Sequence, residues 1–279
     1  MSSRHFTPDE GLLLSILNVA ARAGKPEMVS RVLEALSGLG IEPQEHHLVA
    51  LMEAYVAAGQ VPEAMQVLST IRSVGLHPTA VTAEPILAVL SSVDVVDNAF
   101  YALEDLKAKG EVIDITALNV IIEASSRLND LQRVRANQMA ASDLGVKLDI
   151  DSFNSALSAC VGSNHRALGD TIMKEMAEAG ITPNGTTYHH MIRLCTKQAK
   201  YDDAFFFLEK SKSEGFKPTR EAYRELAIKC QANKDARWQL VVEEMESLGY
   251  KWVPPSSDGD APSGVRRRRP TSRGSSAAA

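Results

Sequence analysis

The chain has 279 residues, of which 44% are hydrophobic, 5% aromatic and 23% charged, and its formal net charge is −5. No apolar run reaches the roughly 18 residues of a membrane-spanning helix, so the sequence predicts a protein without a membrane partner. The acidic balance disfavours general binding of nucleic acid, because such binding depends on basic side chains that neutralise phosphates.

The first residues, 1–9, are predicted to be a short extension ahead of the first helix. The segment from Met1 to Pro8 is too short and too polar for a signal peptide or a complete transit peptide. We therefore expect either a cytoplasmic protein or one whose targeting segment precedes this sequence.

From residue 10 onward, one pattern repeats with a period of 35 residues. Each period holds helix-forming residues that are interrupted near the middle, and it ends at a glycine, which favours the left-handed conformation of a helix end. In four periods a proline follows the glycine by three residues and cannot continue the helix. The glycines are Gly40, Gly75, Gly110, Gly145, Gly180, Gly215 and, one residue early, Gly249, and the prolines are Pro43, Pro78, Pro183 and Pro218.

Each period therefore predicts a helix, a turn, a second helix and a stop. A unit of this size cannot bury its apolar face alone, so successive units must stack and share a core. We predict an all-α fold, a right-handed α-solenoid of about seven helix-turn-helix repeats over residues 10–253. The predicted units are 10–44, 45–79, 80–114, 115–149, 150–184, 185–219 and 220–253.

Three cysteines occupy equivalent positions in successive units: Cys160, Cys195 and Cys230 are 35 residues apart. Equivalent helices in stacked units lie about 10 Å apart, beyond the roughly 7 Å limit on the Cα separation of a disulfide. We expect reduced core residues, with a metal site or a catalytic thiol as the minor alternative, because ligand spacing typical of zinc and a local partner histidine are missing.

The C-terminal segment 254–279 has a different composition. Proline, serine, glycine and alanine surround a run of four arginines, Arg266 to Arg269, and no apolar periodicity is present, so a disordered Arg-rich tail is predicted. A tether to RNA, a nuclear import signal and a solubilising tail are three open interpretations. The tail carries five arginines and two aspartates, and its net charge of +3 leaves −8 for residues 1–253.

The repeat resembles the pentatricopeptide repeat family, in particular its mitochondrial members. The likeness covers residues 10 to about 253 and is carried by Ser152-Phe-Asn-Ser155, by Thr187-Tyr188, by Ala204 with the hydrophobic residues after it, and by the glycine-to-proline endings. The tetratricopeptide repeat, a close competitor, has a shorter unit with a Trp-Leu-Gly-Tyr pattern that this chain lacks. The resemblance implies an adaptor that binds single-stranded RNA, one base per repeat.

In this family the fifth and last residues of a unit face one base. The positions that match are Asn119 with Asp149 in the fourth unit and Asn154 with Asn184 in the fifth. The family's code implies uridine for the first pair and cytidine or uridine for the second. An amide offers a donor and acceptors, and a carboxylate can accept the imino proton of uracil. The alternative interpretation is that Asp149 and Asn184 cap helices.

The resemblance also implies two further groups of contacts. The second residues of successive units sandwich a base, and the thirteenth residue contacts the RNA backbone. The sandwiching residues would be Thr116, Asp151 and Thr186, and the phosphate contacts would be Arg22, Arg127 and Lys197.

Only two of the seven units carry a readable pair. Two bases contribute roughly 2–6 kcal/mol, against about 12 kcal/mol for nanomolar affinity. Two functions therefore stay open: an RNA-binding adaptor in the maturation, splicing, stability or translation of mitochondrial transcripts or ribosomal RNA, or a protein-interaction scaffold on the mitochondrial ribosome with little RNA affinity.

The expected partners follow from these two functions. They are a pyrimidine-containing single strand and ribosomal or RNA-processing proteins, with the chain itself a monomer. No catalytic constellation stands out in the sequence, so we expect no enzymatic activity, metal or cofactor.

Overall fold

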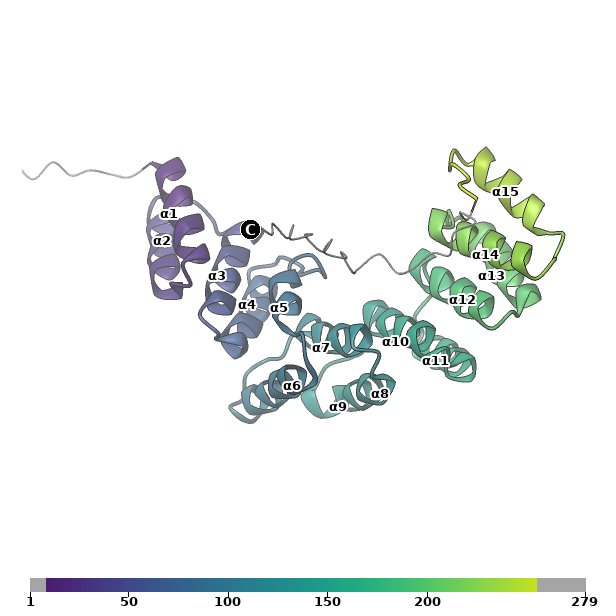
Figure 1. Cartoon of the computed structure of the whole chain (residues 1–279). Helices are drawn as coiled ribbons and strands as arrows, with labels where there is room; N and C mark the ends of the chain where they lie inside the picture. The colour runs from purple at the N-terminus through teal and green to yellow at the C-terminus, as the bar shows by residue number, and fades with distance from the viewer. Residues whose placement is uncertain (1–8, 255–279) are drawn as a thin grey trace, which may run out of the picture.

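The computed structural model describes residues 9–254, in which fifteen α-helices and no strands are found. The helices follow one another along a curved array (Figure 1), which confirms the predicted all-α solenoid of about seven two-helix units. Its handedness stays a prediction, and the predicted disordered tail lies outside the described residues.

The helices form seven successive pairs, of which the fourth has its second helix divided in two. They are α1 (Glu10–Arg22) and α2 (Pro26–Gly38), α3 (Glu45–Ala57) and α4 (Val61–Ser73), α5 (Glu84–Val89) and α6 (Val93–Ala108), α7 (Ile115–Arg127) with α8 (Leu131–Met139) and α9 (Ala141–Leu144), α10 (Ile150–Ser163) and α11 (Arg166–Glu178), α12 (Gly185–Lys197) and α13 (Tyr201–Ser213), and α14 (Arg220–Ala232) and α15 (Trp238–Ser247).

The helix ends follow the sequence signals. All seven glycines of the 35-residue period adopt positive φ, between 71° and 86°, where a residue with a Cβ would be strained. Several first helices begin at a residue whose side chain accepts a hydrogen bond from a backbone N–H of the first turn, as Asp149 does for α10. These ends set the length of each hairpin, and thereby the register of the stack.

The first helix of the third unit is unusually short. Two threonine hydroxyls stabilise a turn before it, with the Thr79 N–H donating to Thr82 Oγ1 at 3.0 Å, and Pro85 then occupies the first turn of α5. The helix consequently starts at Glu84 and spans only six residues. The fifth position of this unit is therefore the first residue of its helix.

The first helices pack against one another in series: α1 contacts α3, α7 contacts α10, α10 contacts α12, and α12 contacts α14. The core lies between them and the second helices, and its side chains are mostly aliphatic. Cys160, Cys195 and Cys230 are fully buried and reduced in this core, as expected, and burial raises the pKa of each thiol to about 11. None of the helices in residues 9–254 is long and apolar enough to cross a lipid bilayer.

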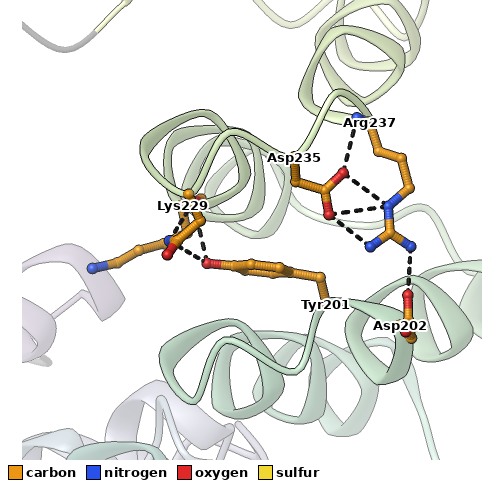
Figure 2. A network of polar contacts seen from close by, with 6 residues as sticks. Tyr201, Asp202, Lys229, Asp235 and Arg237 are labelled. Carbon is orange, nitrogen blue, oxygen red and sulfur yellow. Dashed lines mark hydrogen bonds and ion pairs between the residues drawn. The ribbon is translucent and has the colours of Figure 1, made fainter.

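Polar networks connect neighbouring units on the side of the second helices. Figure 2 shows Arg237 between the carboxylates of Asp235 and Asp202, with N–O distances of 2.6 Å to each. Nearby, Tyr201 Oη donates to the carbonyl oxygen of Lys229 at 3.1 Å. Exposed ion pairs of this kind stabilise a fold by at most about 1 kcal/mol each. The contacts join the start of α13 to α14 and to the turn before α15.

Candidate nucleic-acid interface

A groove of about 360 Å³ runs across α5, α7, α10 and α12 on the side formed by the first helices. Seven of the ten residues that the sequence singled out line it: Thr116, Asn119, Arg127, Asp149, Asp151, Asn154 and Thr186. Residues spaced by about one repeat meet there because equivalent positions of stacked units are lateral neighbours.

Asn119 and Asp149 are directly hydrogen-bonded. Asn119 Nδ2 donates to the two carboxylate oxygens of Asp149 at 2.9 and 3.1 Å, while its Oδ1 accepts from Ser152 Oγ at 2.5 Å. A carboxylate only accepts, so the amide can be oriented in one way alone. Asp149 also accepts from the Ser152 N–H at 3.0 Å and so caps α10. Asn119, Asp149 and Ser152 thus hold one donor, the Asn119 amide, and one acceptor, the Asp149 carboxylate, in fixed orientations at the groove surface.

The same arrangement recurs one unit later. Asn154 Nδ2 donates to Asn184 Oδ1 at 3.3 Å, and its Oδ1 accepts from Thr187 Oγ1 at 2.7 Å. Asn184 caps α12 by accepting from the Thr187 N–H at 3.0 Å. Asn184 itself does not line the groove, and Asn154 is only 6% exposed. The two last-position residues therefore act as helix caps and as partners of the fifth-position amides at once.

A third pair, which the sequence interpretation left out, occupies the equivalent positions of the sixth unit. Thr219 Oγ1 and His189 Nδ1 are 2.7 Å apart, and Thr219 also caps α14. Burial and then the positive charge of Arg193 lower the pKa of His189 below 6.5, so its ring is neutral near pH 7. The 35-residue period places His189 and Thr219 at the paired positions, but a pair that contains histidine is not among the readable pairs of the family's code.

The three residues predicted to sandwich bases differ in exposure. Thr116 is buried and its hydroxyl lies 3.5 Å from the carbonyl oxygen of Pro78, whereas Asp151 and Thr186 are exposed beside the groove. Partial desolvation of the Asp151 carboxylate beside the groove, and then the neighbouring carboxylate of Asp149, raise the pKa of Asp151. The geometry therefore leaves Asp151 and Thr186 more accessible to a ligand than Thr116.

The three predicted phosphate contacts are not brought together. Arg127 lines the groove, where it pairs with Glu123 at 3.1 Å and Glu84 at 3.8 Å. Lys197 Nζ donates to the carbonyl oxygen of Val161 at 2.7 Å near the end of α10, outside the groove. Arg22 is on α1, at the far N-terminal end of the array. Of the three, only Arg127 is placed to meet a strand in the groove.

The groove is acidic. Four carboxylates line it, against two arginines, and both arginines are already paired with carboxylates. The lining also includes His190, whose Nδ1 is buried without a hydrogen-bond partner in the described part of the chain. Burial, followed by His189 and Arg193, lowers the pKa of His190 to about 4, so this ring adds no positive charge near pH 7.

Two sequence profiles match the chain. One, described as a pentatricopeptide repeat-containing protein, matches residues 10–137, and one described as a pentatricopeptide repeat domain matches residues 171–230. Among curated relatives, the mitochondrial pentatricopeptide repeat-containing protein At1g26460 of Arabidopsis thaliana is 22% identical over 267 residues, which is 88% of this chain and 41% of the relative. The pentatricopeptide repeat-containing protein At5g25630 of the same plant is 19% identical over 72% of this chain and 35% of its own length.

Solved structures show the same architecture. The chain is similar to the crystal structure of the pentatricopeptide repeat protein PPR10 from maize, with a TM-score of 0.52 and 22% identity over 90% of this chain and 36% of that one. PPR10 in complex with an 18-nt psaJ RNA element gives a TM-score of 0.55 at 17% identity, over 90% of this chain and 37% of that one. Likenesses at this level establish the α-solenoid fold, and the chain spans less than half the length of these proteins.

Proposed function

The chain belongs to the pentatricopeptide repeat family, and we propose from this that it binds a short single strand of RNA along the groove of α7, α10 and α12. In this proposal it acts without enzymatic activity, as an adaptor in the maturation, splicing, stability or translation of mitochondrial RNA. The observation that carries the proposal is the recurrence of one hydrogen-bonded pair at the same place in three successive units: Asn119–Asp149, Asn154–Asn184 and His189–Thr219.

The first pair suits uracil. The second amide hydrogen of Asn119 is a donor, and the carboxylate of Asp149 beside it keeps free acceptor positions. Uracil presents a carbonyl acceptor next to its N3–H donor, which is the complementary order. One base can therefore bond to both side chains while the cap of α10 stays intact.

The second pair suits cytosine as well as uracil. Asn184 Oδ1 is occupied by the Asn154 amide and by the cap. The donors left for a ligand are Asn154 Nδ2, in the groove lining, and Asn184 Nδ2, outside it. The Watson–Crick edge of cytosine carries two adjacent acceptors, N3 and O2, and can accept from two donors. A pyrimidine-containing strand thus fits two neighbouring units.

The expected affinity is modest. Three units at roughly 1–3 kcal/mol per base contribute roughly 3–9 kcal/mol, and a nanomolar complex needs about 12 kcal/mol. The acidic groove adds little phosphate attraction, because both of its arginines, Arg72 and Arg127, are already paired with carboxylates. A protein partner that supplies basic side chains would strengthen the complex.

Binding of fluorescent uridine, cytidine and adenosine oligomers tests the proposal. We expect the two pyrimidine strands to bind more tightly than the adenosine strand, and Asn119→Ala and Asn154→Ala each to weaken pyrimidine binding about tenfold, equivalent to about 1.4 kcal/mol. Asn98→Ala, at an exposed position on α6 outside the groove, is the matched control and should change nothing. Equal and negligible binding of all three strands would reject the RNA function.

A protein-interaction scaffold is the second candidate function, and the acidic lining of the groove favours it. Four carboxylates suit a basic protein segment, such as an extension of a ribosomal protein, at least as well as they suit RNA phosphates. If RNA binding is negligible while a basic peptide competes for the groove, the scaffold replaces the adaptor.

Mitochondrial localisation is part of the proposal. It is supported by the name of one relative, although another relative is named as chloroplastic: At3g09650 of Arabidopsis thaliana, which is 22% identical over 69% of this chain and 25% of its own length. A cytoplasmic location is the alternative. Imaging of the whole gene product fused to a fluorescent protein distinguishes the two.

A further inference from the structure

Helix α1 presents an apolar stripe at the N-terminal end of the array. Leu12, Ile16 and Val19 are 39%, 37% and 69% exposed, while the opposite face of the helix is buried. Met28 of α2 is 45% exposed beside them, and Ile16, Val19 and Met28 line a shallow apolar groove of about 300 Å³. In Figure 1, α1 is the first helix of the described residues, and it packs on α2 and α3.

The equivalent positions of later units show that this stripe is a stacking surface. Leu12 is the third residue of its unit, and the third residue of every later unit is at most 3% exposed, because the preceding unit packs on it. The residues equivalent to Ile16 follow the same rule from the third unit onward, where Ile86, Ile121, Ala156, Met191 and Leu226 are fully buried. Among the described residues, α1 therefore exposes the face with which the repeat stacks.

The stripe is also self-complementary. Asp9 precedes Leu12 by three residues, and Arg22 follows Val19 by three. If two copies of α1 lie antiparallel, Leu12 of one faces Val19 of the other, Ser15 faces Ile16, and the acidic start of each helix lies near the basic end of its partner. Antiparallel helices also align their dipoles favourably. A contact in which each patch meets its own copy has two-fold symmetry and closes on itself.

From this geometry we propose that two copies of the chain associate through α1, stacking end to end as a two-fold symmetric dimer, in place of the monomer expected from the sequence. The contact of one helix face and the edge of α2 is smaller than the roughly 800 Å² per partner of a standard interface. The dimer is therefore weak, with a dissociation constant on the order of 10–100 µM.

Sedimentation velocity of the full chain over a range of concentrations measures this association. Dimer should accumulate as the concentration rises, and Ile16→Glu and Val19→Glu should each weaken association at least about tenfold, because each buries a carboxylate in the contact. Met139→Glu, at a position on α8 that is 74% exposed, is the matched control and should leave the dimer unchanged. Circular dichroism and pyrimidine binding verify that the variants are folded.

A cross-link tests the antiparallel register. Ser15→Cys places one thiol near the two-fold axis, so a short bifunctional maleimide should join two chains, while Ser142→Cys, exposed on α9, should stay uncoupled. The three native cysteines are buried, which keeps the background low. A chain that is monomeric at every concentration would overturn the proposal. So would a dimer that tolerates both glutamates, or one that forms only after residues 1–8 are removed.

Discussion

At the residue scale, the side chain of the last residue of a unit both caps the next helix and bonds to the fifth-position amide. Asp149 accepts a backbone N–H of α10 and the amide of Asn119, and Asn184 does the same for α12 and Asn154. Capping and base reading are therefore compatible interpretations of these residues. The cap orients the side chain, and the oriented side chain fixes the amide that faces the groove.

Asp149→Asn should separate helix capping from the choice of base. Asparagine caps helices about as well as aspartate, so the thermal midpoint should change little. The fourth unit would then carry two amides, as the Asn154–Asn184 pair does, and its preference should shift from uridine toward cytidine. Competition between the two oligomers measures the shift. Asp149→Ala is the contrast: it removes the cap as well, at a cost of about 1 kcal/mol.

His47 should make stability depend on pH. It is 2% exposed, its Nδ1 accepts from the Gln44 N–H at 3.1 Å, and its Nε2 is buried without a partner among the described residues. Burial and then the neighbouring His46 lower its pKa below 6.5. Protonation would remove the acceptor that Gln44 needs, so the unfolded state binds the proton more tightly than the folded state.

This contribution to stability is complete above pH 6.5 and is lost as the pH falls below that value. His190, whose pKa is lowered to about 4, acts in the same direction over the window from 6.5 to 4. The thermal midpoint should therefore fall between pH 7 and pH 5, and that of His47→Gln should fall less steeply. Exposed His77→Gln is the control. An identical slope for His47→Gln and the wild type would contradict this account.

At the element scale, the turns between helices differ in how tightly they are packed. Gly24 and Gly59 both join the two helices of a unit with positive φ, 62° and 76°. A Cβ on Gly24 would lie 3.1 Å from the backbone carbon of Ala57, whereas a Cβ on Gly59 would meet nothing within 4 Å. The turn at Gly24 therefore touches the next unit, and the turn at Gly59 does not.

The substitutions Gly24→Ala and Gly59→Ala should separate the cost of a positive φ from the cost of a steric clash with the next unit. Gly59→Ala should cost about 1–2 kcal/mol, since only the left-handed conformation is penalised. Gly24→Ala should cost about 1–3 kcal/mol more, because the backbone of Ala57 cannot move aside as a side chain would. Chemical denaturation measures both free energies of unfolding. Equal losses would mean that the first two units are packed more loosely than the structure shows.

Most helix boundaries were readable from the sequence, but α5 was not. Its late start depends on the hydroxyls of Thr79 and Thr82, which form a local turn in competition with the helix. Each threonine alone is an ordinary helix residue. The outcome was decided by their hydrogen bonds and by the Pro85 that follows.

At the scale of the whole molecule, the shape of the groove favours binding of a single strand, whereas its acidic lining disfavours it. The curved stack offers a groove lined by the Asn119–Asp149 pair and by Asn154, yet the carboxylates around it outnumber the arginines. Helix α1, the first helix of the described residues, offers an exposed apolar stripe. Selective contacts with bases or basic peptides, and contacts between copies, suit such a molecule better than general attraction to nucleic acid.

The sequence by itself determined the period, the glycine at the end of each unit's second helix, the burial of the three cysteines and the grouping of residues one repeat apart. These follow from local signals and from one-dimensional stacking, in which each unit meets only its neighbours. Asn119 and Asn154 could be placed on one surface for that reason.

Only the tertiary structure decided how those side chains are bonded. Hydrogen bonds are directional and depend on rotamers and on partners from adjacent units, which spacing does not specify. For this reason the sequence did not predict three contacts that the structure shows. They are the His189–Thr219 pair, the pairing of Arg127 with carboxylates, and the hydrogen bond of Lys197 to Val161 outside the groove. The exposure of α1 belongs with them, because whether a stacking face is covered depends on what is packed beside it.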